Sequence, residues 1–377
     1  MTFFALVLRE IKSMFTNPVV SLTVFGGVIF YSFLYPLPYS NQTVQELPIS
    51  VVNLDKSQAS FQLERMVDAT AQVKVVQRDH TINAAKTSLL NQDVSGILVI
   101  PEHFYKDLLL GKSPTLAYAG DASYFLIYGA VVEGLGQAGG TLAAQVKVSQ
   151  LMMDGTPLSL ASQQFTPVEL NAKPTFNPRM GYIDYVVPAV FVLILQQTLA
   201  MAAGLIGGTQ KTESGYWLGI SPIKLISARV LALTLVYYLL ALYYFGASFE
   251  MYGISRLAAM SSLALLLLPF LLSTSFIGIL LGAILPRREL VTLVVLISSM
   301  PLIFLAGFIW PVESIPAGLV WLSQLFPSTP AIQAFLSMNQ MGAELHHISE
   351  QYTLMWLQTL LWGFIALHYF IKSHRSQ

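Results

Sequence analysis

The chain has 377 residues, of which 54% are apolar and only 11% are charged, and its mean hydropathy is +0.61. A soluble protein carries about 25% charged residues, so this chain has too few polar side chains to cover a globule of its size. Its 20 basic and 20 acidic residues cancel, which excludes electrostatic binding of nucleic acid, and the absence of cysteine excludes disulfides and thiol catalysis. The composition therefore predicts a membrane protein.

Uncharged gaps in the sequence locate the membrane spans, because a segment that crosses lipid must be a helix of about 20 mostly apolar residues. Six gaps are long enough, and Pro269 predicts a kink in the fourth. They run over residues 13–45, 185–210, 230–249, 257–286, 290–312 and 351–371. A further uncharged stretch, 314–343, is divided by prolines into pieces shorter than a bilayer, so we interpret it as re-entrant or interfacial.

The distribution of basic residues predicts the orientation of these spans. If the N-terminus is cytoplasmic, only Arg256 falls in a short outer loop. The basic residues that then lie inside are Arg9, Lys12, Lys211, Lys224, Arg229, Arg287, Arg288, Lys372 and Arg375. We therefore expect both termini in the cytoplasm. The first span is expected to be a retained anchor, because it ends in Tyr35-Pro36-Leu37-Pro38 and not in the small residues of a signal-peptide cleavage site.

Between residues 45 and 179 the composition becomes that of a soluble domain. Short β-like runs such as PISVVNL, VKVVQ and GILVI alternate with helical patterns, which predicts a small α/β domain outside the membrane. A long helix is expected to follow, up to about Met153, and then a Pro-rich linker over 155–178. One face of that helix would carry Val131, Leu135, Ala138, Leu142 and Val146.

The expected fold class is thus an α-helical polytopic membrane protein with six transmembrane helices and an inserted extracytoplasmic α/β domain. Residues 1–40 would form an N-terminal interfacial helix and the first span, and residues 41–180 the α/β domain with its long helix and linker. Residues 181–377 would form a five-helix membrane domain with a cytoplasmic coupling loop over 209–229 and the re-entrant segment. In the interfacial helix, Phe4, Leu8, Ile11 and Phe15 share one face.

Glycine and histidine patterns in the chain favour structural roles. Gly134, Gly136 and Gly139 have the spacing of a dinucleotide fingerprint, but a helical pattern precedes them, so we interpret them as helix-packing residues. The pairs Gly204/Gly208 and Gly278/Gly282 predict close helix packing. The histidines form no metal-ligand pattern, and the adjacent His346 and His347 would face different directions on a helix. Without a nucleotide site of its own, the chain would need another polypeptide for any work driven by ATP.

Several motifs and their order resemble the permease subunits of ABC-2 type ABC exporters, in the subgroup with a large extracytoplasmic insert between the first two transmembrane helices. The shorter motifs are Arg9-Glu10, Asn17-Pro18, Phe176-Asn177-Pro178 and the segment 213–222. The strongest is AGFIWPVESIP over 306–316, which is similar to the family's small-Gly-x-x-x-Pro turn followed by a second proline. Two positions differ: Ala306 stands where the family often has Ser, and 212–215 read TESG where the family has a fuller Glu-Arg-Gly-Thr.

The resemblance implies a permease that moves an amphipathic, lipid-like or drug-like substrate outward across the bacterial inner membrane. It further implies a second permease copy and a separate ATPase subunit that binds ATP and Mg²⁺, so the chain itself would not be an enzyme and would hold no cofactor. Membrane lipid and an extracytoplasmic adaptor are further expected partners. The residues expected to couple to the ATPase are Arg9, Glu10, Glu213, Gly215, Trp217, Ser221 and Pro222. Those expected in the extracytoplasmic re-entrant turn are Gly307, Trp310, Pro311, Glu313 and Pro316.

Three alternative functions belong to other classes. A membrane-anchored extracytoplasmic receptor would bind a ligand in the α/β domain and signal inward, but it gives four of the six spans no role. A secondary transporter usually shows internal repeats, and the first three spans share no clear pattern with the last three. A membrane-embedded hydrolase would need a cluster of polar catalytic residues at one depth, which the spans do not show.

Overall fold

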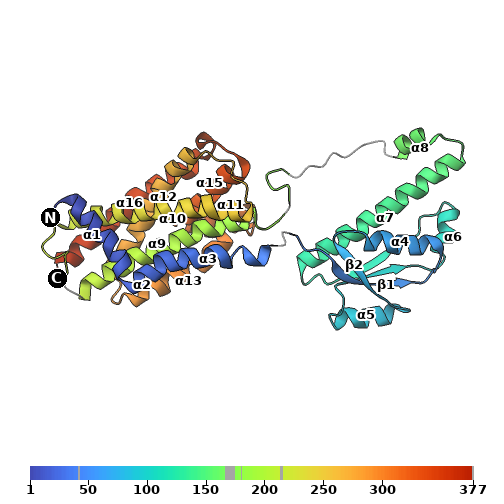
Figure 1. Cartoon of the computed structure of the whole chain (residues 1–377), viewed down its shortest axis with the longest axis horizontal. Helices are drawn as coiled ribbons and strands as arrows, with labels where there is room; N and C mark the ends of the chain where they lie inside the picture. Colours follow the sequence, from blue (N-terminus) through green and yellow to red (C-terminus); the bar gives the residue numbers. More distant parts are fainter. Residues whose placement is uncertain (41–42, 166–174, 180, 213–214, 376–377) are drawn as a thin grey trace. The chain divides into compact units, whose positions relative to one another are not determined.

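The computed structural model describes residues 1–40, 43–165, 175–179, 181–212 and 215–375 (Figure 1). The chain divides into two compact units. Unit 1 combines Met1–Gln42 with Pro174–Gln377, and unit 2 is Thr43–Lys173. Unit 2 therefore interrupts unit 1 in sequence.

Unit 1 is a bundle of helices, and both chain ends lie at the same end of it (Figure 1). The first part of the chain supplies α1 (Phe3–Thr16), α2 (Pro18–Ser21), the π-helical turn η1 (Leu22–Gly26), α3 (Gly27–Leu34) and η2 (Leu37–Tyr39). The second part begins with α9 (Val186–Thr212), α10 (Pro222–Leu242), the π-helical η3 (Tyr243–Ser248), α11 (Phe249–Tyr252), α12 (Met260–Ile284) and α13 (Glu289–Leu305). It ends with η4 (Val312–Ser314), α14 (Ala317–Ser323), α15 (Ser328–Met341), η5 (Leu345–Ile348) and α16 (Ser349–Arg375).

Five continuous helices in the described ranges are long and apolar enough to cross a membrane. They are Pro18–Tyr39, Val186–Lys211, Pro222–Tyr252, Met260–Ile284 and Leu345–Ser373. The predicted span 290–312 is instead the 17-residue helix α13, about 26 Å long, which ends at Leu305 because Gly307 turns the chain with φ +89°. The structure thus supports a polytopic membrane protein with five long apolar helices and one shorter one.

The boundaries of the third long helix also differ from the predicted ones. The sequence predicts a span over residues 230–249, with Arg229 at the edge of the uncharged gap, yet the helix begins at Pro222. Arg229 lies inside the bundle with none of its surface exposed. A charge ends a span only if it must stay in water, and this one is neutralised by another side chain.

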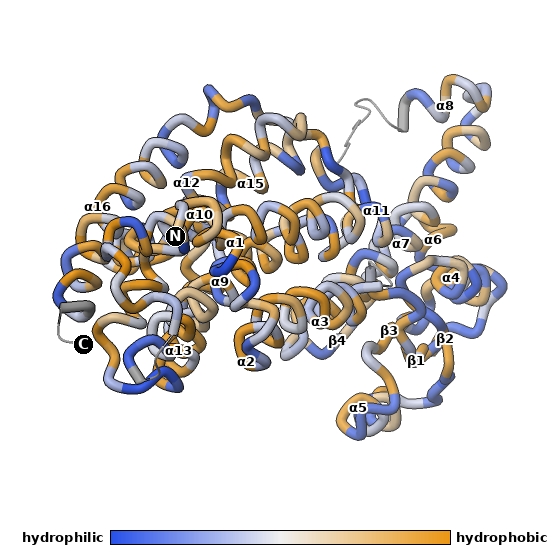
Figure 2. Tube along the Cα trace, turned by 60° about the vertical axis from the view of Figure 1, so that its left-hand side comes forward, coloured by the Kyte–Doolittle hydropathy of each residue, from blue (hydrophilic) through white to orange (hydrophobic). Residues whose placement is uncertain are grey.

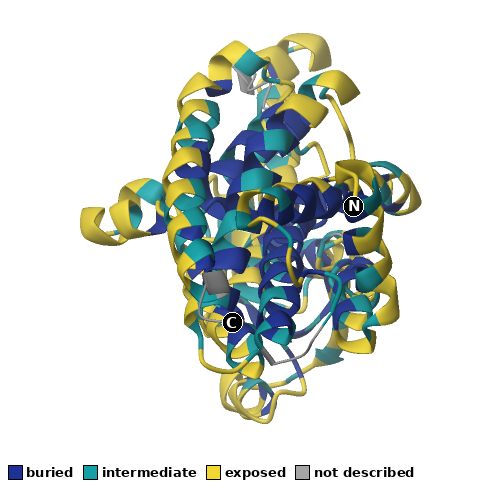
Figure 3. Cartoon of the chain, turned by 90° about the vertical axis from the view of Figure 1, so that its left-hand side faces the viewer, coloured by how far each residue is buried: buried dark blue, intermediate teal, exposed yellow. Residues whose placement is uncertain are grey.

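Helix α9 occupies the interior of unit 1. In its apolar 18-residue segment 94% is buried, against 22% in the corresponding segment of Pro18–Tyr39 and 28% in that of Leu345–Ser373. The buried segments gather inside the bundle and the exposed faces lie outside (Figure 3). Many of these outer faces are hydrophobic (Figure 2), as on α16, where Leu360 is 69% and Phe364 76% exposed. Exposed apolar side chains on long helices are what a lipid-facing surface requires.

Close packing of α9 on α12 confirms the predicted role of the paired glycines. A Cβ on Gly282 would lie 2.6 Å from the carbonyl oxygen of Gly204, and a Cβ on Gly278 would meet the carbonyl oxygen of Ala200. The two backbones therefore approach to a distance that only glycine allows. Such contact supplies the van der Waals attraction that holds helices together in lipid, where apolar burial gives no net driving force.

The stretch 314–343 forms two short helices, α14 and α15, of seven and 14 residues. At 1.5 Å per residue neither can cross a bilayer, which agrees with the interpretation of this stretch as non-spanning. Helix α15 is largely buried, and Phe335 stacks on Phe245 with ring centroids 4.8 Å apart.

Unit 2 contains a four-stranded mixed sheet in the order β2-β1-β3-β4. The strands are β1 (Leu47–Asn53), β2 (Val73–Arg78), β3 (Gly96–Ile100) and β4 (Ala117–Gly120). The helices are α4 (Gln58–Asp68), α5 (Ile82–Leu90), α6 (Phe104–Leu109), α7 (Phe125–Met153) and α8 (Leu158–Phe165). Strand β1 pairs in parallel with β2 and β3, and β4 is antiparallel to β3. The alternation of strands and helices predicted from the sequence is confirmed, whereas α8 falls in the segment predicted as a linker.

The sheet is covered on both faces. Helix α5 packs on one face through Ala85, which contacts Val52 and Ile97. Helices α4, α6 and α7 cover the larger core on the other face. In that core a Cβ on Gly134 would lie 3.2 Å from Thr70 Oγ1, so Gly134 is a helix-packing residue as predicted. The same prediction is wrong for Gly136, which is exposed and where a Cβ would meet nothing within 4 Å.

We predict that Gly278→Ala destabilises unit 1, because the added methyl group forces α12 away from α9. An overpacked site costs about 1–3 kcal/mol. Thermal unfolding of the detergent-solubilised protein should show a lower midpoint. Gly246→Ala is the matched control, since a Cβ there meets nothing within 4 Å. Equal midpoints for the two variants would contradict the close approach of α9 and α12.

Candidate functional site

Helix α1 has two distinct faces. Leu6, Val7, Glu10 and Met14 are buried against the bundle. Three of the four side chains predicted to share an apolar face are turned outward, with Phe4 71%, Leu8 51% and Phe15 58% exposed, whereas Ile11 is half-buried and packs against the core. An amphipathic helix with exposed aromatic and aliphatic side chains is typical of the membrane surface.

The most unusual side chain on the inner face of α1 is Glu10, a fully buried carboxylate. It forms a bidentate ion pair with the fully buried Arg229 of α10: Arg229 Nε donates to Oε2 at 3.0 Å and Nη2 donates to Oε1 at 3.2 Å. Nη2 also donates to the side-chain oxygen of Gln210, near the end of α9. The guanidinium carbon lies 5.7 Å from the ring centroid of Phe370 on α16. This cluster, Glu10–Arg229–Gln210, therefore joins three helices that are distant in sequence.

Removing two charges from water is costly unless the pair is well aligned and further hydrogen bonds complete it. The parallel bonds between guanidinium and carboxylate meet this requirement, and the amide oxygen of Gln210 adds a third. Loss of either partner would leave one charge buried without compensation. The cluster therefore fixes the position of α1 on α10 and α9.

The turn between α9 and α10 lies against the same part of α1. The guanidinium carbon of Arg9 stands 5.9 Å from the ring centroid of Tyr216, and Trp217 packs edge-on against Tyr216 with its own side chain buried. Burial raises the pKa of the Tyr216 hydroxyl above its usual value, and the nearby Glu10 carboxylate raises it further. The ring contacts hold this turn against α1.

Helix α10 starts at Pro222, directly after Ser221, and its first turn is tied to the start of the chain. Lys224 Nζ donates to the backbone oxygen of Met1 at 2.7 Å. The apolar side chains beside Ser221 are exposed, with Leu218 at 56% and Ile223 at 58%. The turn thus has a buried aromatic anchor and an exposed apolar edge.

Basic side chains also join the C-terminal end of α9 to the C-terminal end of α12 and to the segment that follows it. Lys211 Nζ donates to the backbone oxygens of Ala283 and Leu285, which end α12, at 2.5 and 3.0 Å. Arg288 Nη1 donates to Thr209 Oγ1 at 3.3 Å. Charged groups therefore lock α1, α9, α10 and α12 together at one end of the bundle.

A second ion pair lies at the opposite end of α9. Arg179 donates to both carboxylate oxygens of the buried Asp184, at 3.0 and 2.6 Å, and to the backbone oxygen of Gly253 at 2.6 Å. Two residues before Asp184, Tyr182 stacks on Tyr39, with ring centroids 5.6 Å apart. The segment entering α9 is thereby joined to the ends of the first and third long helices.

The predicted turn after α13 is tight. Gly307 has φ +89°, and a Cβ there would collide with Val312, so the turn needs glycine. Phe308 is buried, whereas Trp310 is 57% exposed. Pro311 precedes the single turn η4, which contains Glu313, and Pro316 precedes α14.

Comparison with known protein families gives a match that covers most of the chain. Residues 19–368 match the family described as ABC-2 family transporter protein. The chain belongs to the ABC-2 transporter family. No curated protein matches it. The family assignment and the long apolar helices make this ABC-2 transporter chain a multi-pass membrane protein and the membrane component of an ABC transporter. Membership implies association with an ABC ATPase subunit and a dimeric arrangement.

The structure brings most of the predicted coupling residues of this ABC-2 transporter to one end of the bundle. Arg9 is exposed on α1, Glu10 is buried in the cluster, and Trp217 is buried under the turn. Gly215, Ser221 and Pro222 lie in the turn or at the start of α10. Glu213 lies outside the described residues. Arg9 and Glu10 precede the matched region, so their role rests on their own geometry.

Sequence reasoning missed two members of the buried cluster. Arg229 was assigned only to the cytoplasmic cations, and Gln210 only to the edge of a span. The sequence does contain a signal for this pair: Glu10 and Arg229 have opposite charges, each adjoins an apolar run, and both are predicted on the cytoplasmic side of the membrane. The expectation that His346 and His347 face different directions is wrong, because their ring centroids lie 3.8 Å apart in the turn η5. No group of three metal-binding side chains occurs in the described part of the chain.

We predict that Glu10→Gln lowers the free energy of unfolding by about 3 kcal/mol, because Arg229 is left buried and charged without its carboxylate. Glu289→Gln is the control: Glu289 pairs with Arg288 at 3.2 Å but is 70% exposed, so its loss should leave the unfolding transition close to that of the unaltered protein. Denaturant unfolding in mixed micelles measures both. Arg229→Gln and the double variant complete a cycle, and a coupling energy near zero between the two sites would refute the pairing.

Proposed function

We propose that this chain is the permease of an ATP-driven ABC exporter, acting as two copies with separate ATPase subunits that bind ATP and Mg²⁺. The supporting observation is the buried Glu10–Arg229–Gln210 cluster, which ties the surface helix α1 to α10 and α9. Helix α1, which carries Glu10, lies at the end of unit 1 that holds both termini (Figure 1). A partner that moves α1 would therefore move two long helices with it.

In this proposal the ATPase contacts α1 and the turn after α9. Arg9 and the exposed Leu218 and Ile223 would offer a basic and an apolar contact, and Glu213 would add an acidic one. Buried Trp217 would transmit the movement, since it packs beneath the turn. Such rigid-body transfer needs elements that do not slide on one another, which the bidentate ion pair provides.

The proposed cargo is amphipathic, lipid-like or drug-like and moves outward between the two copies. Support comes from α13, whose outer side is apolar and exposed: Ile297 is 63%, Met300 65% and Phe304 58% exposed. A route lined by such side chains suits a molecule with a large apolar part. Membrane lipid would border the same surface.

The proposed location is the bacterial inner membrane, with both termini in the cytoplasm and unit 2 outside, where an adaptor could bind. This orientation requires an even number of crossings, with α13 as the sixth. Two observations support it: the termini lie at one end of unit 1, and the exposed apolar side chains of α13 suit lipid (Figure 1).

The orientation predicts the labelling pattern of single cysteines, because the chain has none of its own. In intact cells a membrane-impermeant maleimide should label Asn83→Cys in α5 but neither Thr2→Cys nor Ser376→Cys. All three should react after permeabilisation. Labelling of either terminus in intact cells would overturn the proposed orientation.

Coupling to an ATPase is tested by purification and by assay. The tagged protein should co-purify with an ABC ATPase in mild detergent, which neither a receptor nor a secondary transporter would do. In the purified complex, Glu213→Arg should uncouple ATP hydrolysis from transport while membrane insertion stays intact. Glu289→Gln serves as the control. Unchanged coupling in the Glu213 variant would argue against this contact, and the absence of any ATPase would overturn the proposal itself.

A further inference from the structure

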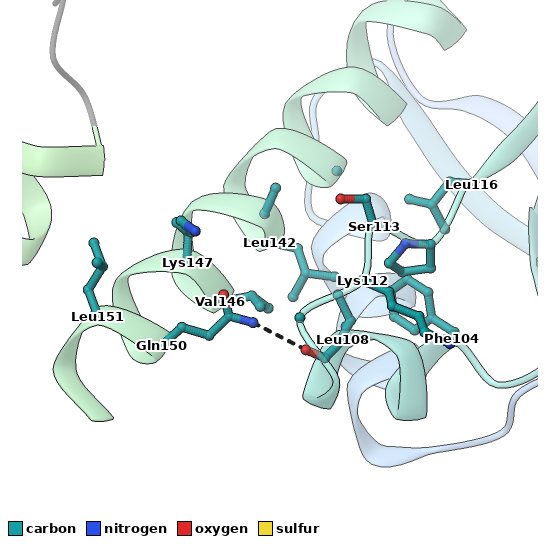
Figure 4. Close-up of a pocket in the computed structure, with 14 residues that line it drawn as sticks. Phe104, Leu108, Lys112, Ser113, Leu116, Leu142, Val146, Lys147, Gln150 and Leu151 are labelled. Carbon is teal, nitrogen blue, oxygen red and sulfur yellow. Dashed lines mark hydrogen bonds between the residues drawn. The ribbon is translucent and has the colours of Figure 1, made fainter. Parts of the chain in front are cut away.

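Unit 2 contains a cavity of about 650 Å³ that the transport proposal does not use. Helix α6, the loop 111–116 and the C-terminal part of α7 form its walls (Figure 4). The volume lies within the range of about 300–1,000 Å³ that is typical of sites for one small organic molecule. The cavity belongs to unit 2 alone.

The floor of the cavity is apolar. Phe104 and Leu108 come from α6, Leu116 from the loop that follows, and Leu142 and Val146 from α7. Phe104 and Leu142 also belong to the core beneath the sheet, so this wall is anchored in the folded unit. A preformed apolar wall of this kind accepts an alkyl chain without reorganising.

The rim of the cavity is basic and polar. Lys112 and Ser113 lie on the loop, and Lys147 and Gln150 lie on α7 (Figure 4). The amide of Gln150 donates to the backbone oxygen of Leu108 at 3.3 Å, which joins α7 to α6. Asp107 Oδ1 lies 3.6 Å from Lys112 Nζ, and its single negative charge offsets only one of the two lysine charges. No carboxylate is among the described residues that line the cavity.

Geometry also leaves free space at Gly139, which lines the cavity. A Cβ there would meet only Leu116 Cδ1, at 3.7 Å, which is ordinary contact. A larger side chain at this position would therefore project into the cavity without moving the backbone. Gly136, on the same helix but exposed, has nothing within 4 Å and offers a matched position outside the cavity.

We propose that this cavity binds a single-chain amphipathic anion, an alkyl carboxylate, with its chain on the apolar floor and its head group between Lys112 and Lys147. Charge complementarity favours an anion over a neutral or cationic amphiphile. The cavity volume favours one alkyl chain over a protein helix or a two-chain lipid. The site stands on the geometry of unit 2 and does not depend on ATP-driven transport.

Cysteine protection in the full-length protein tests this site, because the chain has no other thiol. In nanodiscs of phosphatidylcholine, decanoate should slow the alkylation of Ala143→Cys, on the cavity wall, by at least tenfold. The same treatment should leave Asn83→Cys, on α5, unchanged. Octanoate should need about 16-fold more ligand, since each buried methylene changes affinity about fourfold. Decyltrimethylammonium should give no protection.

Two variants of the cysteine-bearing chain then locate the bound molecule. Gly139→Leu should abolish protection by decanoate, while Gly136→Leu should leave it intact. The double variant Lys112→Gln/Lys147→Gln should weaken protection by tenfold or more. The proposal is overturned if decanoate leaves the Ala143→Cys rate unchanged, protects Asn83→Cys equally, or protects no better than decyltrimethylammonium.

Discussion

The arrangement of unit 1 depends on a pair of opposite charges removed from water. Apolar burial alone cannot choose which helices pair within a bilayer, because lipid is as apolar as the helices. Glu10 and Arg229 supply that choice, since each needs the other to be tolerated without solvent. The guanidinium of Arg229 fixes the position of the amphipathic helix α1 on α10. Its bond to Gln210 holds α9 at the same place.

Close backbone contact between α9 and α12 is a second constraint on the bundle. Gly204, Gly278 and Gly282 let α9 and α12 touch along their backbones, and this shape fits only one register of the two helices. The ion pair and the glycine contacts meet at Gly207 of α9, where an added Cβ would lie 3.5 Å from Gly282 Cα and 3.8 Å from Arg229 Nη1. Together they explain why α9 is enclosed by its neighbours, whereas α16 keeps an apolar outer face toward lipid.

The sequence predicts those features that depend on local patterns. Alternating apolar runs gave the strands of unit 2, the spacing of Val131, Leu135 and Ala138 gave α7, and paired glycines gave the helix contact. Features that depend on distant partners were missed. The charge pattern ends a span at Arg229 because the partner Glu10 is 219 positions away. The same pattern extends α13 too far because the turn at Gly307 does not interrupt the uncharged run.

The third long helix is held by the N-terminal segment at two points, not one. Arg229 near its start pairs with Glu10, and Tyr244 in its π-helical part donates to the backbone oxygen of Val28 at 2.8 Å. Tyr243 also bonds with Ser32 at 2.8 Å. The third long helix is therefore fixed to α1 at one point and to α3, the helix that continues the N-terminal segment, at another. Displacement of α1 must therefore carry the first and third long helices together, which is the mechanical property that a transporter driven from one end of its bundle requires.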